Sequence, residues 1–196
     1  RELRPHSRLS KAAVPLVHAL PCVDRRLDQS AMTDRPKVAW LYLGRRGAMA
    51  KFALDLARSV GRDRSNVFVV AESNALAADL ASCGADVRLV PVFVRDRDAL
   101  AVWRSGRLAR SLRQVLVQEN AQTMVELMGH VWSPFFEGAI KAAGVRRVTL
   151  LHDWRAHPGD ASALATRWLA GSALRADRIV TLSGFVVAQV RRANPN

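Results

Sequence analysis

The stretch at residues 38–60, VAWLYLGRRGAMAKFALDLARSV, places a strand, a glycine loop and a helix in that order. Its first six residues are apolar and stop at Gly44, which is typical of a short strand buried on both faces. From about residue 47 the apolar residues recur at helical spacing until Gly61. This order is the repeating unit of α/β proteins with a parallel sheet.

The same unit recurs along the rest of the chain. Further apolar strands are expected at 66–71, 87–94, 122–128, 147–152 and 178–182, and helices at about 47–60, 73–82, 98–118, 133–143, 161–175 and 184–193. Gly84 and Gly144, like Gly61, stand where helices should end. The alternation predicts an α/β fold with a doubly wound parallel sheet (Rossmann-like), about six strands and helices on both faces, joined by right-handed crossovers.

The chain of 196 residues, 49% of them hydrophobic, is long enough for one domain with a good core. Residues 1–31 show neither helical nor strand periodicity and contain three prolines, so we expect a disordered extension there and a domain over 36–193. Cys22 and Cys83 form neither a disulfide framework nor a metal-binding pair, which suits a reducing cytoplasm.

The formal net charge is +13, and the basic residues are mostly arginines spread over every segment. This spread favours general anionic contacts, with phosphates or acidic lipids, over a specific nucleic-acid site, whose motifs are absent. No apolar run approaches the ~20 residues of a membrane span. The helix expected at 98–118 carries an arginine at every third residue: Arg104, Arg107, Arg110 and Arg113. Beside them runs an apolar stripe of Leu108, Leu112, Val115 and Leu116. This pattern is compatible both with a solvated helix face and with a contact with anionic lipid.

An open parallel sheet binds ligands outside the carboxyl ends of its strands, so the residues after each strand are candidates. The loop GRRGAMAKF at 44–52 presents backbone amides at a helix start, which suits an anion, although a plain tight turn is the competing interpretation. With only two glycines it supports a dinucleotide site weakly, and Glu72 would then be the ribose-binding acid. Ser183 lacks the glycine pattern of a hydrolase nucleophile.

The segment TLLHDWRAHPGDASAL at 149–164 ends a strand on His152 and Asp153. A metal site, a catalytic dyad and a ligand-binding edge are the three interpretations. Metal is disfavoured because His152, Asp153, His157 and Asp160 all fall in one loop, whereas zinc sites recruit ligands from several elements. Asp160 is better explained as a helix N-cap.

Several of these motifs together resemble the family-4 retaining glycosyltransferases of GT-B fold. The resemblance rests on the strand ending in HD, the following HPG and acid, the segment ADRIVTLSGFV, and GHVWSPFFEGAIKAAGVRRVTLLHD at 129–153. It covers about residues 36–193 and points to the N-terminal, acceptor-side domain. The chain stops about where the linker to the second, donor-binding domain begins in that family.

The resemblance implies a hexosyl-type enzyme that moves a sugar from a nucleotide-sugar to a glycan, lipid or small-molecule acceptor. The expected setting is cell-envelope polysaccharide synthesis in the cytoplasm, with peripheral contact at the inner face of an anionic membrane. The chain alone is expected to be inactive, and neither a cofactor nor a metal is expected.

By position, His152 is the expected catalytic residue, facing the transferred sugar as a neutral hydrogen-bond donor oriented by Asp153. Gly44, Arg45, Arg46, Gly47 and His130 are the further substrate-binding residues that the resemblance implies, with Arg45 and Arg46 replacing the glycines of many members. The alternatives are a stand-alone Rossmann-like nucleotide- or dinucleotide-binding domain, such as a nicotinamide-dependent enzyme, and a basic interaction domain without catalysis.

Overall fold

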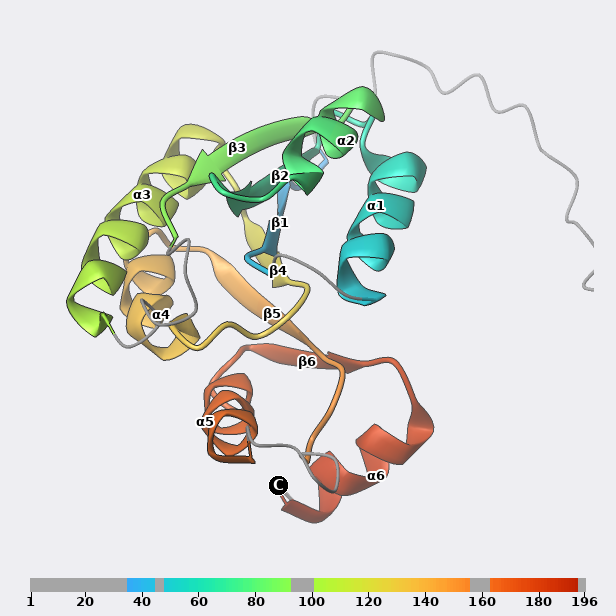
Figure 1. The fold of residues 1–196 in the computed structure, drawn as a ribbon, viewed down its shortest axis with the longest axis vertical. Coiled ribbons are helices and arrows are strands. Elements are labelled where there is room, and N and C mark those ends of the chain that lie inside the picture. The colour runs from blue at the N-terminus through green and yellow to red at the C-terminus, as the bar shows by residue number, and fades with distance from the viewer. Residues whose placement is uncertain (1–34, 45–47, 93–100, 156–162, 194–196) are drawn as a thin grey trace, which may run out of the picture. The chain divides into compact units, whose positions relative to one another are not determined.

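The computed structural model describes residues 35–44, 48–92, 101–155 and 163–193, which form a six-stranded, fully parallel sheet (Figure 1). The strand order is β3-β2-β1-β4-β5-β6. The strands are β1 (Val38–Tyr42), β2 (Asn66–Ala71), β3 (Asp86–Val90), β4 (Thr123–Glu126), β5 (Arg146–Leu151) and β6 (Arg178–Thr181). The predicted doubly wound α/β fold is therefore confirmed.

Helices alternate with the strands along the chain. They are α1 (Ala48–Val60), α2 (Leu76–Ser82), α3 (Ser105–Gln118), α4 (Ser133–Ala142), α5 (Ala163–Ala173) and α6 (Gly184–Ala193), and a 3₁₀ turn, η3 (Val102–Arg104), precedes α3. Gly84 and Gly144 adopt φ angles of 82° and 71° after α2 and α4, a conformation that glycine adopts without strain. The predicted helix stops at these two positions are confirmed.

Several element boundaries differ from the sequence prediction by a few residues, and two of the differences have a clear local reason. The second helix begins at Leu76 instead of residue 73, because the side chain of Asn74 accepts a hydrogen bond from the Leu76 amide at 2.9 Å and forms a turn first. The third strand ends at Val90 because Pro91 follows and has no amide hydrogen for the sheet. Residues 93 and 94 of the expected strand and residues 98–100 of the expected helix lie outside the described ranges.

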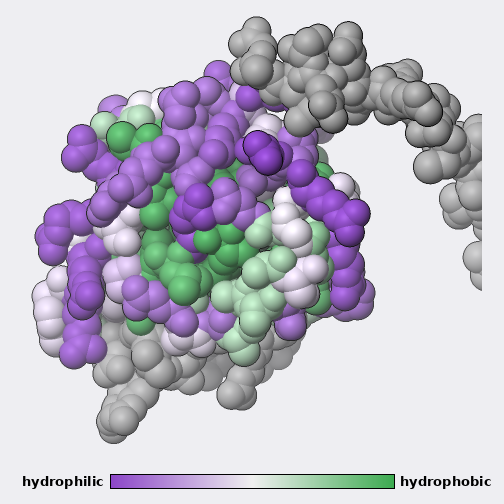
Figure 2. Space-filling model, turned by 90° about the horizontal axis from the view of Figure 1, so that it is seen from above, coloured by the Kyte–Doolittle hydropathy of each residue, from purple (hydrophilic) through white to green (hydrophobic). Residues whose placement is uncertain are grey.

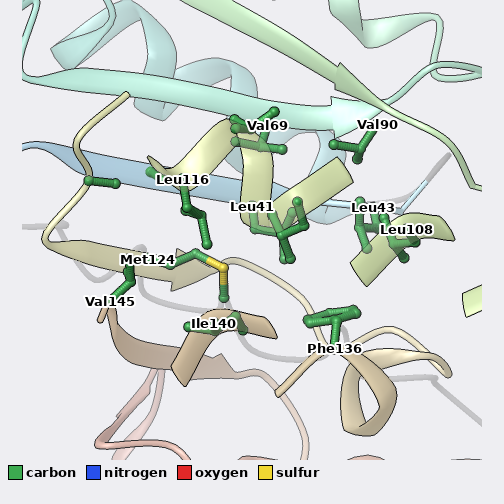
Figure 3. Packing of buried hydrophobic residues seen from close by; sticks show 14 of the residues in the cluster. Leu41, Leu43, Val69, Val90, Leu108, Leu116, Met124, Phe136, Ile140 and Val145 are labelled. Carbon is green, nitrogen blue, oxygen red and sulfur yellow. The ribbon is translucent and has the colours of Figure 1, made fainter. Parts of the chain in front are cut away.

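The described core contains two large clusters, one on each face of the sheet, and a small third cluster of Leu151, Ala173 and Val186 between β5, α5 and α6. On one face α1 and α2 pack against a cluster that includes Phe68 and Val70 of β2. On the other face α3 and α4 pack against Leu41, Val69 and Met124, as Figure 3 shows. The predicted apolar stripe of α3 is buried in this second cluster: Leu108, Leu112, Val115 and Leu116.

Figure 2 shows the end of the molecule that lies at the top of Figure 1, where β3 and α2 are found. Hydrophobic side chains lie at the centre of this face, and hydrophilic side chains surround them. The edge strand β3 carries Asp86 and Arg88 in addition to its apolar residues. Charged side chains on an edge strand discourage pairing with a further strand.

The direction of winding reverses at β1, which pairs with β2 on one side and with β4 on the other. The helices that follow β1 and β4, α1 and α4, therefore lie on opposite faces of the sheet, and folds of this kind bind ligands at such a reversal, at the carboxyl edge. The fold places the candidate site at this edge.

Candidate functional site

A cavity of about 350 Å³ lies at the carboxyl edge of β4 and β5. Its wall takes residues from the start of α1, the loop after β4, the start of α4, the end of β5 and the inner face of α5, including Met49, Gly129, Ser133, His152, Asp153 and Leu169. The cavity therefore occupies the position that the switch in strand order predicts for a ligand.

His152 and Asp153 come directly after β5 and both line this cavity. His152 Nδ1 lies 2.9 Å from Asp153 Oδ2, and the two side chains are 49% and 42% exposed. A carboxylate only accepts hydrogen bonds, so this contact places a hydrogen on Nδ1. In the neutral ring Nε2 is then an acceptor, and only the protonated ring donates through Nε2.

That geometry changes the role expected from the sequence. A neutral His152 donating through Nε2 would turn the lone pair of Nδ1 toward the carboxylate of Asp153. The arrangement instead suits two roles for Nε2, namely acceptance of a ligand hydroxyl or donation from a protonated ring.

Gly44, the first residue of the glycine loop, is buried and fixed by its neighbours. Its carbonyl accepts a hydrogen bond of 2.6 Å from the side chain of Asn74. A Cβ atom here would lie 2.8 Å from the hydroxyl oxygen of Tyr42 and would also collide with the end of Met128. Gly44 is therefore required by close packing under the loop. Arg45, Arg46 and Gly47, which the sequence also predicts as ligand contacts, lie outside the described residues.

His130 lies in the turn between β4 and α4, and its side chain is buried. Its Nδ1 accepts a hydrogen bond from the Trp132 amide at 3.2 Å, and its own amide donates to Ser133 Oγ at 2.8 Å. Gly129 and Ser133 line the cavity on either side of it. The imidazole thus supports the turn, and its predicted contact with an acceptor stays a prediction.

Glu126, which the sequence analysis did not single out, lies at the base of the cavity. It is the last residue of β4, and only 1% of it is exposed. Its Oε2 accepts hydrogen bonds from Arg147 Nη2 at 2.7 Å and Thr149 Oγ1 at 3.3 Å, and Ser133 Oγ donates to Oε1. Because Ser133 also accepts from the His130 amide, Glu126 fixes the turn that borders the cavity.

Arg147 is the counterion of Glu126, and its side chain is 5% exposed. Its Nη1 donates to Glu137 Oε1 at 3.1 Å, and its Nη2 donates to Ser172 Oγ at 3.0 Å. Its Nε is buried and has no hydrogen-bond partner in the described part of the chain. The guanidinium thereby connects β4, α4 and α5.

Glu137 of α4 completes this buried polar cluster, which we define as Glu126, Ser133, Glu137, Arg147, Thr149 and Ser172. Burial opposes ionisation of Glu137, but hydrogen bonds from Arg175 and Ser172 and the charge of Arg147 outweigh it, so its pKa is lowered. The sequence signal for the cluster is a carboxylate near the end of one expected strand, 122–128, and a guanidinium at the start of another, 147–152. This signal predicts an ion pair only when β4 and β5 are known to be neighbouring strands, as the structure shows.

The other candidates of the sequence analysis lie outside this cavity. Glu72 is exposed after β2 and is absent from the described cavity wall. Ser183 Oγ accepts a hydrogen bond from the Val186 amide at 3.3 Å and so caps α6. Within the described ranges, no three His, Cys, Asp or Glu side chains are grouped as a metal site would need, and no helix is long and apolar enough to cross a bilayer. His157 and Asp160 lie outside those ranges, as do residues 1–31.

The model of Glycosyltransferase Family 4 matches residues 49–195 of this chain. Two solved structures have the same fold. MurG from Acinetobacter baumannii superposes with a TM-score of 0.52 at 14% identity, over 77% of this chain and 42% of its own. HepE from Anabaena, solved in complex with UDP and glucose, superposes with a TM-score of 0.50 at 11% identity, over 81% of this chain and 50% of its own. This chain thus matches half or less of the length of these structures, and none of the curated proteins matches it.

Proposed function

Because the chain belongs to Glycosyltransferase Family 4, we propose that residues 36–193 are the N-terminal, acceptor-side domain of a retaining glycosyltransferase of GT-B fold. The donor is a nucleotide-sugar held mainly by a second domain, and the acceptor is a glycan, a lipid or a small molecule. The observation that carries the proposal is the placement of His152 and Asp153 on the wall of a cavity at the carboxyl edge of the sheet.

In the proposed reaction, the bond between the anomeric carbon of a hexose and the donor phosphate oxygen breaks, and its electron pair leaves with the nucleotide. An acceptor hydroxyl forms the new bond on the same face of the sugar, and its proton passes to the departing phosphate oxygen. Negative charge therefore builds on the departing phosphate. Groups that are positioned in advance to meet this charge lower the barrier most.

His152 is the proposed catalytic residue. With Nδ1–H held by Asp153 at 2.9 Å, the ring is oriented and its Nε2 faces the reacting sugar. A protonated ring donates to the developing charge, and a neutral ring accepts a sugar hydroxyl and positions it. Asp153 acts by orienting the ring through this hydrogen bond.

Gly44, Arg45, Arg46, Gly47 and His130 are the further proposed substrate contacts. Arg45 and Arg46 would add positive charge at the start of α1, where the helix dipole already favours an anion. The proposal requires neither a metal nor a cofactor. The chain of residues 1–196 alone is proposed to bind nucleotide-sugars weakly and not to transfer sugar.

The test is made on the full-length gene product with a panel of nucleotide-sugars, by following the release of nucleoside diphosphate. We expect His152→Ala to lower kcat by about 10²–10³, the usual cost of losing one well-placed donor, while KM for the donor changes by less than about threefold. Glu72→Ala is the matched control, because Glu72 is also an exposed residue after a strand but lies outside the described cavity wall.

Near-normal turnover of His152→Ala would show that the histidine is structural and would remove the basis of this site. Tight binding of a nicotinamide dinucleotide that is lost in Glu72→Ala would instead favour the dinucleotide-binding alternative. Thermal melts of both variants should match the parent, since both side chains are exposed.

A further inference from the structure

The side wall of the cavity at the carboxyl edge is built mainly from aliphatic side chains. They come from α1, the loop after β4, the end of β5 and α5, and include Met49, Met128, Leu150, Leu151, Leu169 and Ala173. No Phe, Tyr or Trp belongs to the described part of this wall, so a nucleobase finds no ring there on which to stack. The volume of about 350 Å³ is typical of pockets that hold small molecules, which are mostly apolar with a few placed polar groups.

The hydroxyl groups at the polar base of the cavity already donate their hydrogens to carboxylates. Ser133 and Thr149 both donate to Glu126. Ser172 donates to Glu137 Oε1 at 2.6 Å. A hydroxyl has only one hydrogen to donate, so these three groups can only accept a hydrogen bond from a ligand.

The guanidinium of Arg147 is engaged in the same way. Its Nη1 donates to Glu137 Oε1 at 3.1 Å and to the Ser172 carbonyl at 3.3 Å. Its Nη2 donates to Glu126 Oε2 at 2.7 Å and to Ser172 Oγ at 3.0 Å. These bonds use all the hydrogens of both Nη atoms, and the remaining donor, Nε, is itself buried. Among the described side chains, the base therefore offers acceptors to a ligand but no accessible donor.

The mouth of the cavity also offers acceptors. Asp153 accepts from His152 Nδ1 at 2.9 Å, which leaves Nε2 of the neutral ring as an acceptor. A hydroxyl at the mouth can donate to either side chain. Hydrocarbon can cover the base at little cost, because the polar groups there already have partners within the protein.

This pattern of acceptors without donors discriminates between classes of ligand. A phosphate or carboxylate only accepts hydrogen bonds, and it would meet the carboxylates of Glu126 and Asp153 without a donor from the base. A sugar would place several hydroxyls against the aliphatic wall, and each one left without a partner weakens binding. An ammonium group would lose its hydration without a free countercharge, because Glu126 is paired with Arg147 and Asp153 with His152.

We infer that the cavity takes a neutral alcohol with a mainly hydrocarbon body, which narrows the acceptor of the proposed reaction to an apolar alcohol. Its body lies against the aliphatic wall, and its hydroxyl lies at the mouth beside His152 and Asp153. The oxygen of that hydroxyl bonds to the anomeric carbon, and its proton passes to the departing phosphate oxygen. The role of the alcohol as sugar acceptor rests on the proposed function, whereas its binding depends only on the cavity.

The experiment is an NMR titration of the isotopically labelled full chain with small probes. Three probes share one carbon skeleton and differ in charge: cyclohexylmethanol, cyclohexanecarboxylate and cyclohexylmethylammonium. The fourth, methyl α-glucopyranoside, is a neutral polyol of similar size. The wall variant is Leu169→Asn, and Leu169→Met keeps the wall apolar. The matched control is Leu164→Asn, because Leu164 belongs to the same helix but is 84% exposed and is absent from the described wall.

We expect cyclohexylmethanol to bind the parent at least about tenfold more tightly than the other three probes. Leu169→Asn should weaken its binding by about tenfold, because an amide replaces part of the apolar wall. Leu169→Met and Leu164→Asn should bind within about threefold of the parent. All three variants should melt close to the parent, since Leu169 is only half-buried and Leu164 is exposed.

Four results would overturn the inference. They are binding of the glucoside as tight as that of the alcohol, tighter binding of the carboxylate or the ammonium, an equal loss in Leu169→Asn and Leu164→Asn, and no binding of cyclohexylmethanol up to its solubility limit. The titration needs neither a nucleotide-sugar nor turnover. Loss of alcohol binding would therefore count against the ligand class, and near-normal turnover of His152→Ala would count against the proposed function, so the two failures are distinguishable.

Discussion

Replacing Arg147 by methionine tests how the base of the cavity is held together. Methionine retains most of the aliphatic volume but removes the guanidinium, which binds Glu126, Glu137 and Ser172. Glu126 would then lie buried without its counterion, with Thr149 at 3.3 Å and Ser133 as its remaining donors. Removing one partner of a buried ion pair typically costs about 3–5 kcal/mol.

Replacing both partners of the pair by apolar residues should lower the free energy of unfolding by less than the sum of the two single replacements. In Glu126→Leu/Arg147→Met no charge is left unpaired, and a buried pair exchanged for apolar side chains is often tolerated. We therefore expect the double variant to recover about 2–3 kcal/mol relative to additivity. Ser133 and Thr149 lose their shared acceptor in the double variant, so the recovery should be incomplete.

The assay is urea unfolding at neutral pH, read from the shift in midpoint at an unchanged m value. Arg175→Met is the matched control, because Arg175 also binds Glu137 but is exposed, and exposed ion pairs contribute about 0–1 kcal/mol. Additive single variants, or an Arg147→Met variant no less stable than Arg175→Met, would refute the claim that this pair is buried and coupled.

Three further predictions concern the rest of the domain. Gly44→Ala should lower stability by about 1–3 kcal/mol, because its Cβ meets the buried ring of Tyr42, whereas Gly138→Ala, which meets open space, should not; equal melts would contradict this. Burial opposes ionisation of Glu119, but hydrogen bonds from Lys37 and Arg88 outweigh it, so its pKa is lowered. Its charge therefore stabilises the fold above the unfolded pKa of about 4.3, and this contribution is lost as the pH falls through the folded pKa. Glu119→Gln should flatten the acid side of a plot of stability against pH, and an unchanged plot would count against the role of this network. Deletion of residues 1–31 should leave the melting temperature unchanged, as their lack of periodicity predicts, and a large loss would show that they pack on the domain.

The positions of the elements could be predicted because the signals are local. Each strand is a short apolar run, and helices end at Gly84 and Gly144, where a positive φ favours glycine. Two of the boundary errors were also local in origin. The side chain of Asn74 forms a hydrogen bond that delays the start of α2, and Pro91 lacks the amide hydrogen that would extend β3. The placement of His152 and Asp153 on a cavity wall followed from one rule, that parallel strands share a carboxyl edge.

The polar base of the cavity could not be predicted in the same way, because it depends on which strands are neighbours. Glu126 lies opposite Thr149 in the register of β4 and β5, two positions along from the pair of Met124 and Arg147. Side chains two apart on a strand share a face, so Glu126 and Arg147 both point to the face covered by α4 and α5. Each alone looks like a charge at a strand end, where solvent would satisfy it. Only the non-local pairing brings them together, and the helices that cover them turn two surface-like residues into a buried ion pair that holds the turn beside the cavity.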